Sequence, residues 1–203
     1  SGVKCLAIYI LVGGIVGSAT AFFLQSLDYV TLLRTNHIWV VYFLPIAGLV
    51  IGLLYHYYGD AANKGNNLLI ETHQSLENGE TSKPIPFKMA PMVFISTLLT
   101  HIAGGSAGRE GTAVQMGGAI ADQFTAILKI NAADRKTILI IGISSGFAAV
   151  FGTPLAGAFF AIEILSITNT KKNQLVTSLF VAYIAHYSCL AWQVKHTIYS
   201  IPN

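Results

Sequence analysis

Long apolar runs that carry almost no charge alternate along the chain with short polar stretches. The first run, residues 5–24, has no charged residue over 20 positions, which is enough for a helix to cross a bilayer core about 30 Å thick. Similar runs follow at residues 38–55, 87–103 and 174–192. The pattern therefore predicts four membrane-spanning helices. Polar residues at 171–172 and 193–203 predict a loop and a tail.

A fifth apolar run is interrupted. Residues 137–162 carry no charge over 26 positions, but Gly152-Thr153-Pro154 divides them. A proline inside a helix removes a backbone hydrogen bond and kinks or ends the helix. We therefore predict a helix that follows an N-cap at Asn131 and ends near Phe151, and then a short helix over residues 154–165.

Residues 68–76 are apolar but too few to span a membrane. Directly before them, Gly65-Asn66-Asn67 predicts a turn in which an asparagine caps the helix N-terminus. Residues 78–86 are polar, contain two prolines and predict a loop. Residues 64–76 have two interpretations: a capped amphipathic helix in a surface loop, or a half-helix that begins at membrane depth.

Glycines gather around the pair Arg109-Glu110, at positions 104, 105, 108 and 111. Each glycine costs a helix interior about 1 kcal/mol relative to alanine. A segment of small residues, 111–128, follows. We predict a helix that breaks inside the membrane and restarts near Gly111. Irregular backbone at this depth is tolerated only where it is buried in protein or lines a cavity.

Composition places the chain in a membrane. Hydrophobic residues make up 53% and charged residues 10%, against about 25% charged residues in soluble domains, and the mean hydropathy is +0.60. The net charge of +3 is spread over several loops, which argues against nucleic acid as a partner. Scattered histidines and two cysteines inside apolar runs match no metal site or nucleophile–base pair. We expect no cofactor, no metal and no enzyme activity.

The restarted helix is the candidate site. A helix N-terminus presents unpaired N–H groups and a partial positive charge, which together attract anions. A carboxylate at the bilayer centre costs at least roughly 2.5 kcal/mol, so the presence of Glu110 in this segment requires an explanation. Ionised, Glu110 would occupy the anion site, attracted by the N–H groups of Gly111, Thr112 and Ala113. Protonated, it would swing out and carry a proton. A salt bridge with Arg109 is the structural alternative.

Residues 108–112, Gly-Arg-Glu-Gly-Thr, are followed by Ala-Val-Gln-Met-Gly-Gly. This stretch resembles the CLC family of anion channels and proton-coupled anion antiporters, whose motif there is usually Gly-Arg/Lys-Glu-Gly-Pro. Residues 65–69, 146–157 and 162–163 resemble further family stretches in order and spacing. The resemblance implies an all-α membrane protein of tilted and broken helices. Residues 1–203 would form a single transmembrane domain, equivalent to the first half of an inverted repeat.

The resemblance also implies roles for individual residues. Glu110 would be the gating glutamate, which competes with the anion and takes up the external proton. The anion would be bound at the two helix starts, by Asn66, Asn67, Gly108, Arg109, Gly111, Thr112 and Ala113. The family's inner proton-transfer glutamate would fall at Ile164, so that role is absent here. Neighbouring Glu163 is then expected to be structural.

Three departures from the family pattern point in one direction. Asn66 replaces a serine, Thr112 replaces a proline, and Ile164 replaces the inner glutamate, as in the fluoride-exporting branch of bacterial CLC proteins. An asparagine side chain can donate N–H bonds to a small, strongly hydrated anion. The implied function is fluoride/proton antiport in the lipid bilayer of the bacterial cytoplasmic membrane. A C-terminal half would complete the subunit, and helices 154–165 and 174–192 would contribute to a homodimer.

Two other functions remain open at this point. The first is a chloride/proton exchanger or chloride channel of the same family, with chloride in place of fluoride. The second is a non-transporting half-CLC membrane scaffold.

Overall fold

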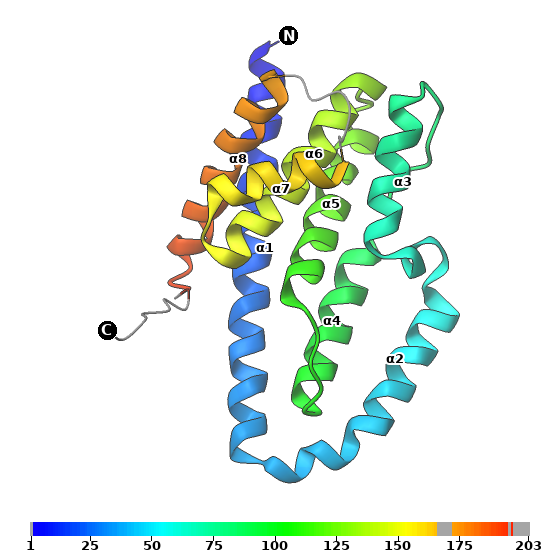
Figure 1. The fold of residues 1–203 in the computed structure, drawn as a ribbon, viewed down its shortest axis with the longest axis vertical. Helices are drawn as coiled ribbons and strands as arrows, with labels where there is room; N and C mark the ends of the chain where they lie inside the picture. Colours follow the sequence, from blue (N-terminus) through cyan, green and yellow to red (C-terminus); the bar gives the residue numbers. More distant parts are fainter. Residues whose placement is uncertain (1, 166–171, 195, 197–203) are drawn as a thin grey trace.

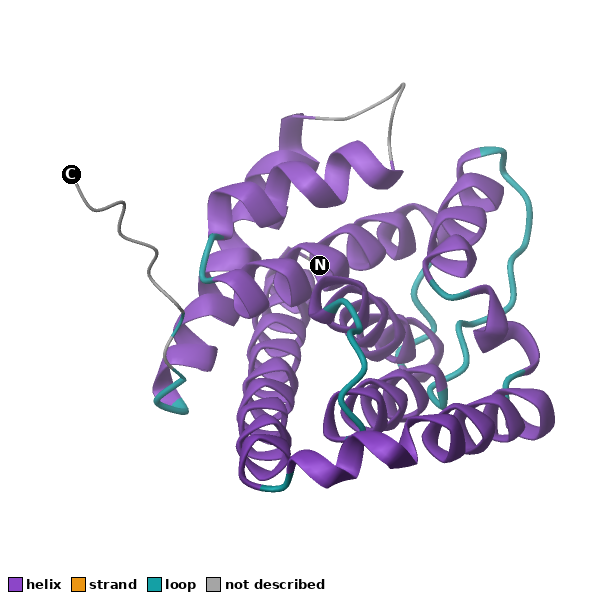
Figure 2. Ribbon diagram, turned by 60° about the horizontal axis from the view of Figure 1, so that its bottom comes forward, coloured by secondary structure: helices purple, strands orange, loops and turns teal. Residues whose placement is uncertain are grey.

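The computed structural model describes residues 2–165, 172–194 and 196, and these residues form helices and loops without a strand (Figure 2). The helices are α1 (Gly2–Asn36), η1 (Ile38–Phe43), α2 (Leu44–Tyr58), η2 (Asp60–Lys64), α3 (Asn66–Glu77), α4 (Met89–Ile102), α5 (Arg109–Ile127), α6 (Ala132–Phe151), α7 (Pro154–Leu165) and α8 (Lys172–Ala191). The all-α class is confirmed. The loop predicted at 171–172 and the tail predicted at 193–203 lie mostly outside the described residues.

Helix α1 is longer than predicted. The prediction ended at residue 24, whereas the helix continues through Asp28 and Arg34 to Asn36. No glycine or proline follows Gly17 within it, so nothing in the backbone ends the helix where its side chains become polar. Its 35 residues extend about 50 Å at 1.5 Å per residue. This length exceeds the bilayer core, so α1 tilts or projects into water.

Among the described residues, three helical stretches are long and apolar enough to cross a membrane: Cys5–Asn36, Ile38–Tyr58 and Asn173–Ala191. The span predicted at 87–103 is wrong in length, because α4 has 14 residues and reaches only about 21 Å. Pro86 precedes this helix and Gly104 follows it, so the chain cannot extend the helix at either end.

Figure 1 shows α1 along one side of the molecule and α2 returning along the other, with α4 and α5 between them. Helix α8 packs against the half of α1 that contains the N-terminus, and α7 packs against α6 and α8. No residue of α2 is buried within the chain. Helix α2 contacts α4 along one side and presents most of its apolar side chains outward.

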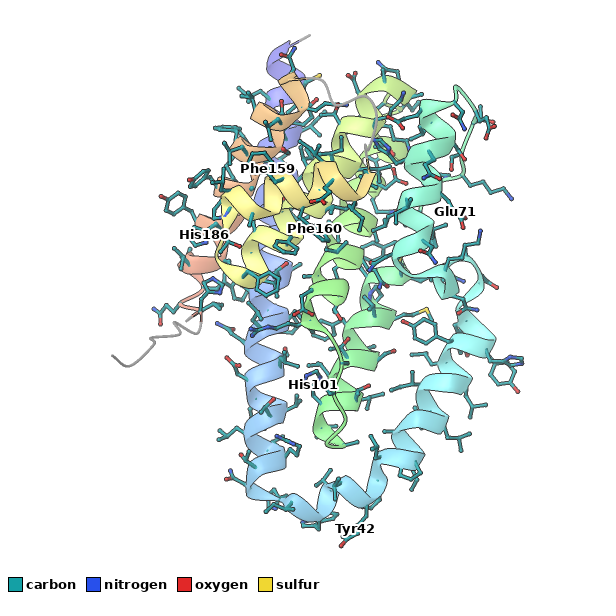
Figure 3. The ribbon with its side chains drawn as sticks, viewed as in Figure 1. Tyr42, Glu71, His101, Phe159, Phe160 and His186 are labelled. Carbon is teal, nitrogen blue, oxygen red and sulfur yellow. The ribbon has the colours of Figure 1, made fainter. Side chains whose placement is uncertain are left out.

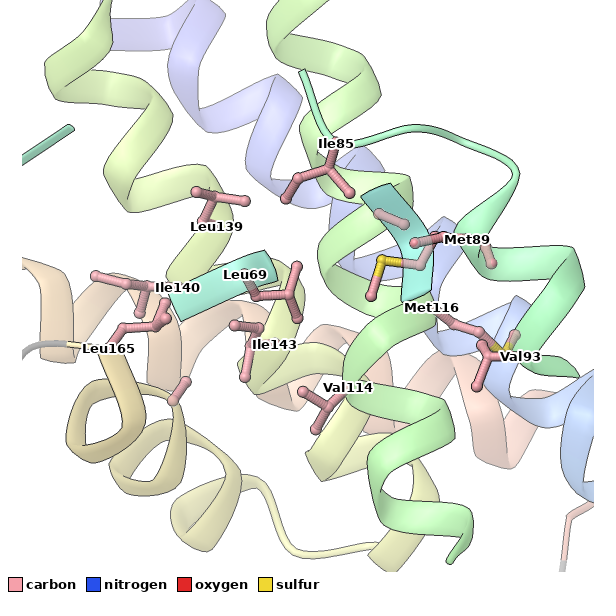
Figure 4. Packing of buried hydrophobic residues seen from close by; sticks show 14 of the residues in the cluster. Leu69, Ile85, Met89, Val93, Val114, Met116, Leu139, Ile140, Ile143 and Leu165 are labelled. Carbon is pink, nitrogen blue, oxygen red and sulfur yellow. The ribbon is translucent and has the colours of Figure 1, made fainter. Parts of the chain in front are cut away.

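The main core lies where α5 and α6 cross, and Figure 4 shows its side chains converging from several helices. A Cβ on Gly117 would lie 2.2 Å from the carbonyl oxygen of Gly142, and one on Gly146 would lie 2.3 Å from the carbonyl oxygen of Ala113. Only glycine permits backbones to approach so closely. The small residues of α5 and α6 thus set the position of the first turn of α5.

Helix α6 ends as predicted. Asn131 caps its start, and the side chain of Asn131 accepts a hydrogen bond from the backbone N–H of Asp134 at 2.8 Å. The helix stops at Phe151, and α7 begins at Pro154. The proline and the left-handed Gly152, with φ of 71°, account for the break.

A buried ion pair holds the loop between α3 and α4. Asp122 of α5 and Arg135 of α6 form two hydrogen bonds of 2.8 Å each, and their exposed fractions are 0% and 8%. Arg135 also donates to the carbonyls of Ser82 and Lys83, and the backbone N–H of Ile85 donates to Asp122 at 2.7 Å. The bidentate pair therefore connects two helices and a loop.

Candidate functional site

The N-termini of α3 and α5 meet in space although their sequences lie far apart. The Nδ2 atom of Asn66, the first residue of α3, lies 3.6 Å from the position that a Cβ would take on Gly111. Gln115, one turn further along α5, lies 3.5 Å from the corresponding position on Gly65. Unpaired N–H groups and the positive ends of two helix dipoles are therefore close together.

The predicted asparagine cap of α3 is wrong. The N-cap residue is Gly65, whose φ of 55° and ψ of −132° suit glycine, and no side chain caps the helix. Asn66 is already the first helical residue, and its Oδ1 is buried without a hydrogen-bond partner. The Nδ2 atom of Asn66, which faces Gly111, is the side-chain donor that a ligand at this junction would meet. Asn67 follows as an exposed residue.

Helix α3 is not part of a surface loop. Four of its side chains are buried: Leu69, Thr72, His73 and Leu76. They pack toward α5, α6 and α7, so the surface-loop interpretation of residues 64–76 is wrong. That the helix begins at membrane depth stays a prediction.

Hydrogen bonds between side chains order the first turn of α5. Gly108 is the N-cap and has extended backbone angles. The Thr112 hydroxyl donates to the Gly108 carbonyl at 3.1 Å and lies 2.7 Å from the Thr97 hydroxyl of α4. Both threonines are buried. Thr112 therefore fixes the turn, and its hydroxyl is already used.

Glu110 lies in the first turn of α5 and is exposed within this chain. Its Oε2 atom lies 2.8 Å from the position that a Cβ would take on Gly108, so the carboxylate bends back toward the helix start. Within the described ranges, the ion pairs do not include Glu110 with Arg109. The predicted salt-bridge alternative is therefore wrong. Arg109 instead places its guanidinium 5.9 Å from the centre of the Phe151 ring.

A cavity of about 610 Å³ opens beside this turn. Glu110 and Arg109 line it together with Asp28 of α1 and His196. Aromatic rings of α6 and α7 support its wall: Phe147 lies 4.3 Å from Phe160 between ring centres, and Figure 3 shows Phe160 on α7. Carboxylate, guanidinium and imidazole groups therefore line the same cavity.

Sequence reasoning missed two members of this cavity. These members are Asp28 and His196, to which the sequence analysis assigns no role. Both lie more than 80 residues from Glu110 along the chain, and neither belongs to a recognisable spacing pattern. No local signal could have assigned them. The structure brings Asn66, Gly108, Arg109, Glu110, Gly111, Thr112 and Ala113 together at the two helix starts.

The comparisons with known proteins agree with this geometry. The sequence model described as "Voltage gated chloride channel" matches residues 47–203. The chain is 48% identical over 198 residues to the "Chloride/fluoride channel protein" of Pseudomonas syringae pv. tomato, and the match covers 98% of the chain and 43% of that protein. It is 30% identical over 173 residues to the "H(+)/Cl(-) exchange transporter ClcA" of Vibrio cholerae, which covers 78% of the chain and 36% of that protein.

A crystal structure of a CLC-type fluoride/proton antiporter superposes on 98% of the chain with a TM-score of 0.89 and 32% sequence identity, and the match covers 49% of that structure. The chain thus spans about half the length of the relatives that it matches. Taken together, the paired helix starts, the matching sequence model and the shared fold show that the chain belongs to the CLC family, whose sequence model is that of the voltage gated chloride channels.

Proposed function

We propose that the chain is the first half of a CLC-type transporter subunit that exports fluoride in exchange for protons. The observation that carries this proposal is the position of the Asn66 Nδ2 donor, which lies 3.6 Å from the Cβ position of Gly111 where two helix N-termini meet. A site built from N–H donors and positive dipole ends suits a small anion. The similarity to a protein named as a chloride/fluoride channel and to a fluoride/proton antiporter supports the same substrate.

Glu110 is the proposed gating and proton-transfer residue. Its ionised carboxylate competes with the anion for the N–H groups of Gly111, Thr112 and Ala113 at the first turn of α5. When the carboxyl group takes up a proton, it loses that attraction and leaves the N–H groups to the anion. One side chain thus links anion binding to proton binding. The cavity beside Glu110 gives the carboxylate space in which to move.

The proposed anion ligands are the side chain of Asn66 and backbone groups of the first turn of α5. Thr112 contributes through its N–H group, since its hydroxyl is bonded to Gly108. Arg109 contributes positive charge from the cavity wall. The exposed position of Asn67 makes its contribution the weakest of the set.

The complete transporter requires parts outside these residues. We infer a single transmembrane domain over residues 1–203, completed by a C-terminal half and embedded in a lipid bilayer. Two such subunits would form a homodimer in which α7 and α8 contribute to the contact. The bacterial relatives make the cytoplasmic membrane the proposed location.

A second candidate substrate is chloride, because the chain also resembles proteins named as H(+)/Cl(-) exchange transporters. The test is ion efflux from liposomes that hold the complete transporter, read by fluoride and chloride electrodes with internal pH recorded. We expect fluoride efflux to exceed chloride efflux by about tenfold or more and to drive protons inward. Equal or faster chloride efflux would identify chloride as the substrate. If neither ion leaves the liposomes, the transport function is rejected and the membrane scaffold is favoured.

Replacement of Asn66 by alanine removes the side-chain donor from the proposed site. A single hydrogen bond to a charged partner contributes about 1.5–3 kcal/mol, so we expect fluoride affinity to fall by roughly 10- to 100-fold. Isothermal titration of the purified complete transporter measures this change. Asn78→Ala, at the far end of α3, serves as the matched control and should leave affinity unchanged. Unaltered fluoride affinity in N66A would exclude Asn66 as a ligand.

A further inference from the structure

The Gln115 side chain lies at the junction of the two helix starts, and the proposed set of anion ligands does not include it. Its carboxamide is half-buried and faces Gly65, the N-cap of α3. The Nε2 atom lies 3.5 Å, and the Oε1 atom 3.8 Å, from the position that a Cβ would take on that glycine. The polar end of Gln115 therefore points at the start of α3.

This carboxamide is not used to hold the fold. Gln123, two turns further along α5, donates to the carbonyls of Ile85 and Ala119. In the described part of the chain, the side chain of Gln115 forms no hydrogen bond. A carboxamide carries two N–H donors and an acceptor, and such groups inside a protein ordinarily have partners. Gln115 thus has donors to offer to a ligand.

Two carboxamides cross between the helices at the junction. Asn66, the first residue of α3, extends toward Gly111 of α5, and Gln115 of α5 extends toward Gly65 before α3. Side chains of a helix lean toward its N-terminus, so the side chain of Gln115 leans back over the turn that contains Gly111. Because glycine has no side chain, both carboxamides border the same bare stretch of α5 backbone.

The space between α3 and α5 is open at Gly111 and closed further along. Among the described residues outside the α5 backbone and the chain neighbours of Gly111, only Asn66 has an atom within 4 Å of its Cβ position. Further along the same face of α5, Leu69 fills the space, because its Cδ2 atom lies 2.6 Å from the Cβ position of Gly118. Gln115 therefore lies between the open helix starts and an apolar floor.

A neutral donor at this point suits a small anion. An anion that leaves water must replace its hydration shell with donors of the protein, and this cost is larger for a smaller ion. Fluoride is smaller than chloride and accepts shorter, stronger hydrogen bonds, so each additional N–H group benefits fluoride more. A carboxamide also does not titrate, so it supplies a donor without adding a second proton site beside Glu110.

We propose that Gln115 is a second side-chain ligand of the anion, and that its N–H donor favours fluoride over chloride. The inference rests on the proposed fluoride/proton exchange. The anion lies against the bare backbone at Gly111, with the Asn66 amide on the α3 side and the Gln115 amide on the side of the apolar floor. Gln115 donates to the anion through Nε2.

The test measures fluoride and chloride affinities of the purified complete transporter by isothermal titration, with Glu110→Gln present throughout so that no carboxylate competes for the site. Gln115→Met keeps the length and helix propensity of the side chain but removes the donor. We expect fluoride affinity to fall roughly 10- to 100-fold and chloride affinity to fall less. Gln74→Met, at an exposed position of α3, is the matched control and should leave both affinities unchanged.

Gln115→Glu gives a second readout, which a packing role would not produce. Its ionised carboxylate repels an anion and donates no hydrogen bond. Fluoride affinity should therefore be low at neutral pH and rise between about pH 6 and pH 4, where a glutamate carboxyl beside negative charge takes up its proton. The same background with Gln115 unaltered should show no such rise.

Unchanged fluoride affinity in Q115M, or equal losses for fluoride and chloride, would overturn the proposal. If Q115M does not fold, as judged by thermal unfolding in detergent, Q115E decides. Fluoride affinity of Q115E that stays constant between about pH 6 and pH 4 excludes Gln115 as a ligand, and affinity that rises on acidification supports it. Failure of the proposed function is distinct, because the unaltered transporter in liposomes would then exchange no fluoride for protons at all.

Discussion

Glu110→Gln is expected to abolish fluoride-driven proton movement while anion movement continues. Glutamine keeps the shape of the protonated carboxylic acid but cannot take up or release a proton near neutral pH. The variant therefore lacks the group that joins the two fluxes. Internal pH and fluoride efflux, recorded together from liposomes holding the complete transporter, should show efflux without proton uptake.

The same replacement is expected to tighten anion binding. An ionised carboxylate at a helix N-terminus gains typically 0.3–1 kcal/mol, and up to about 2 kcal/mol in partly buried geometry. Removing this competitor should raise fluoride affinity by up to roughly 30-fold. Glu163→Gln, at an exposed carboxylate near the end of α7, is the matched control and should retain coupling. Proton uptake that persists in E110Q would remove Glu110 from the proton pathway.

Asp122→Asn is expected to cause the largest loss of stability. The substitution leaves the guanidinium of Arg135 buried without its counter-charge, and breaking a buried pair in this way costs about 3–5 kcal/mol. It also weakens the hold on the loop between α3 and α4, which the same carboxylate anchors through the N–H group of Ile85. Equilibrium unfolding of the purified complete transporter in detergent measures the change.

Two comparisons sharpen this expectation. Glu71→Gln breaks the ion pair of Glu71 with Lys64, whose side chains are about half exposed, and should cost less than about 1 kcal/mol. The double variant Asp122→Leu with Arg135→Met removes both buried charges together and should recover much of the loss. Equal stability of D122N and E71Q would show that burial of the Asp122 pair contributes little.

Much of this architecture could be predicted from local sequence. The interruption at Gly152-Thr153-Pro154 and the cap at Asn131 act on the backbone within a few residues, so their effects need no distant partner. The glycine cluster before Glu110 likewise marks a helix start wherever the rest of the chain lies. The glycine cluster and the break at residues 152–154 also lie in stretches that carry the family resemblance, which the comparisons confirm.

Errors arose where hydrophobicity alone set a boundary. The first span was ended at residue 24 because its side chains become polar, yet the α1 backbone has no reason to stop before Asn36. Residues 87–103 were predicted to span because they are apolar, yet turns at both ends limit α4 to a short helix. The paired asparagines predict an asparagine cap, whereas the N-cap is Gly65, whose positive φ suits glycine.

The sequence by itself therefore determined the membrane class, the order of the helices, the breaks between them and the position of Glu110 at a helix N-terminus. Only the tertiary structure decided that Asn66 meets Gly111 and that Asp122 pairs with Arg135. Propensity, capping and charge patterning act over a few residues. These contacts instead depend on how closely the glycine faces of α5 and α6 approach and on where α3 then packs, which no single segment encodes.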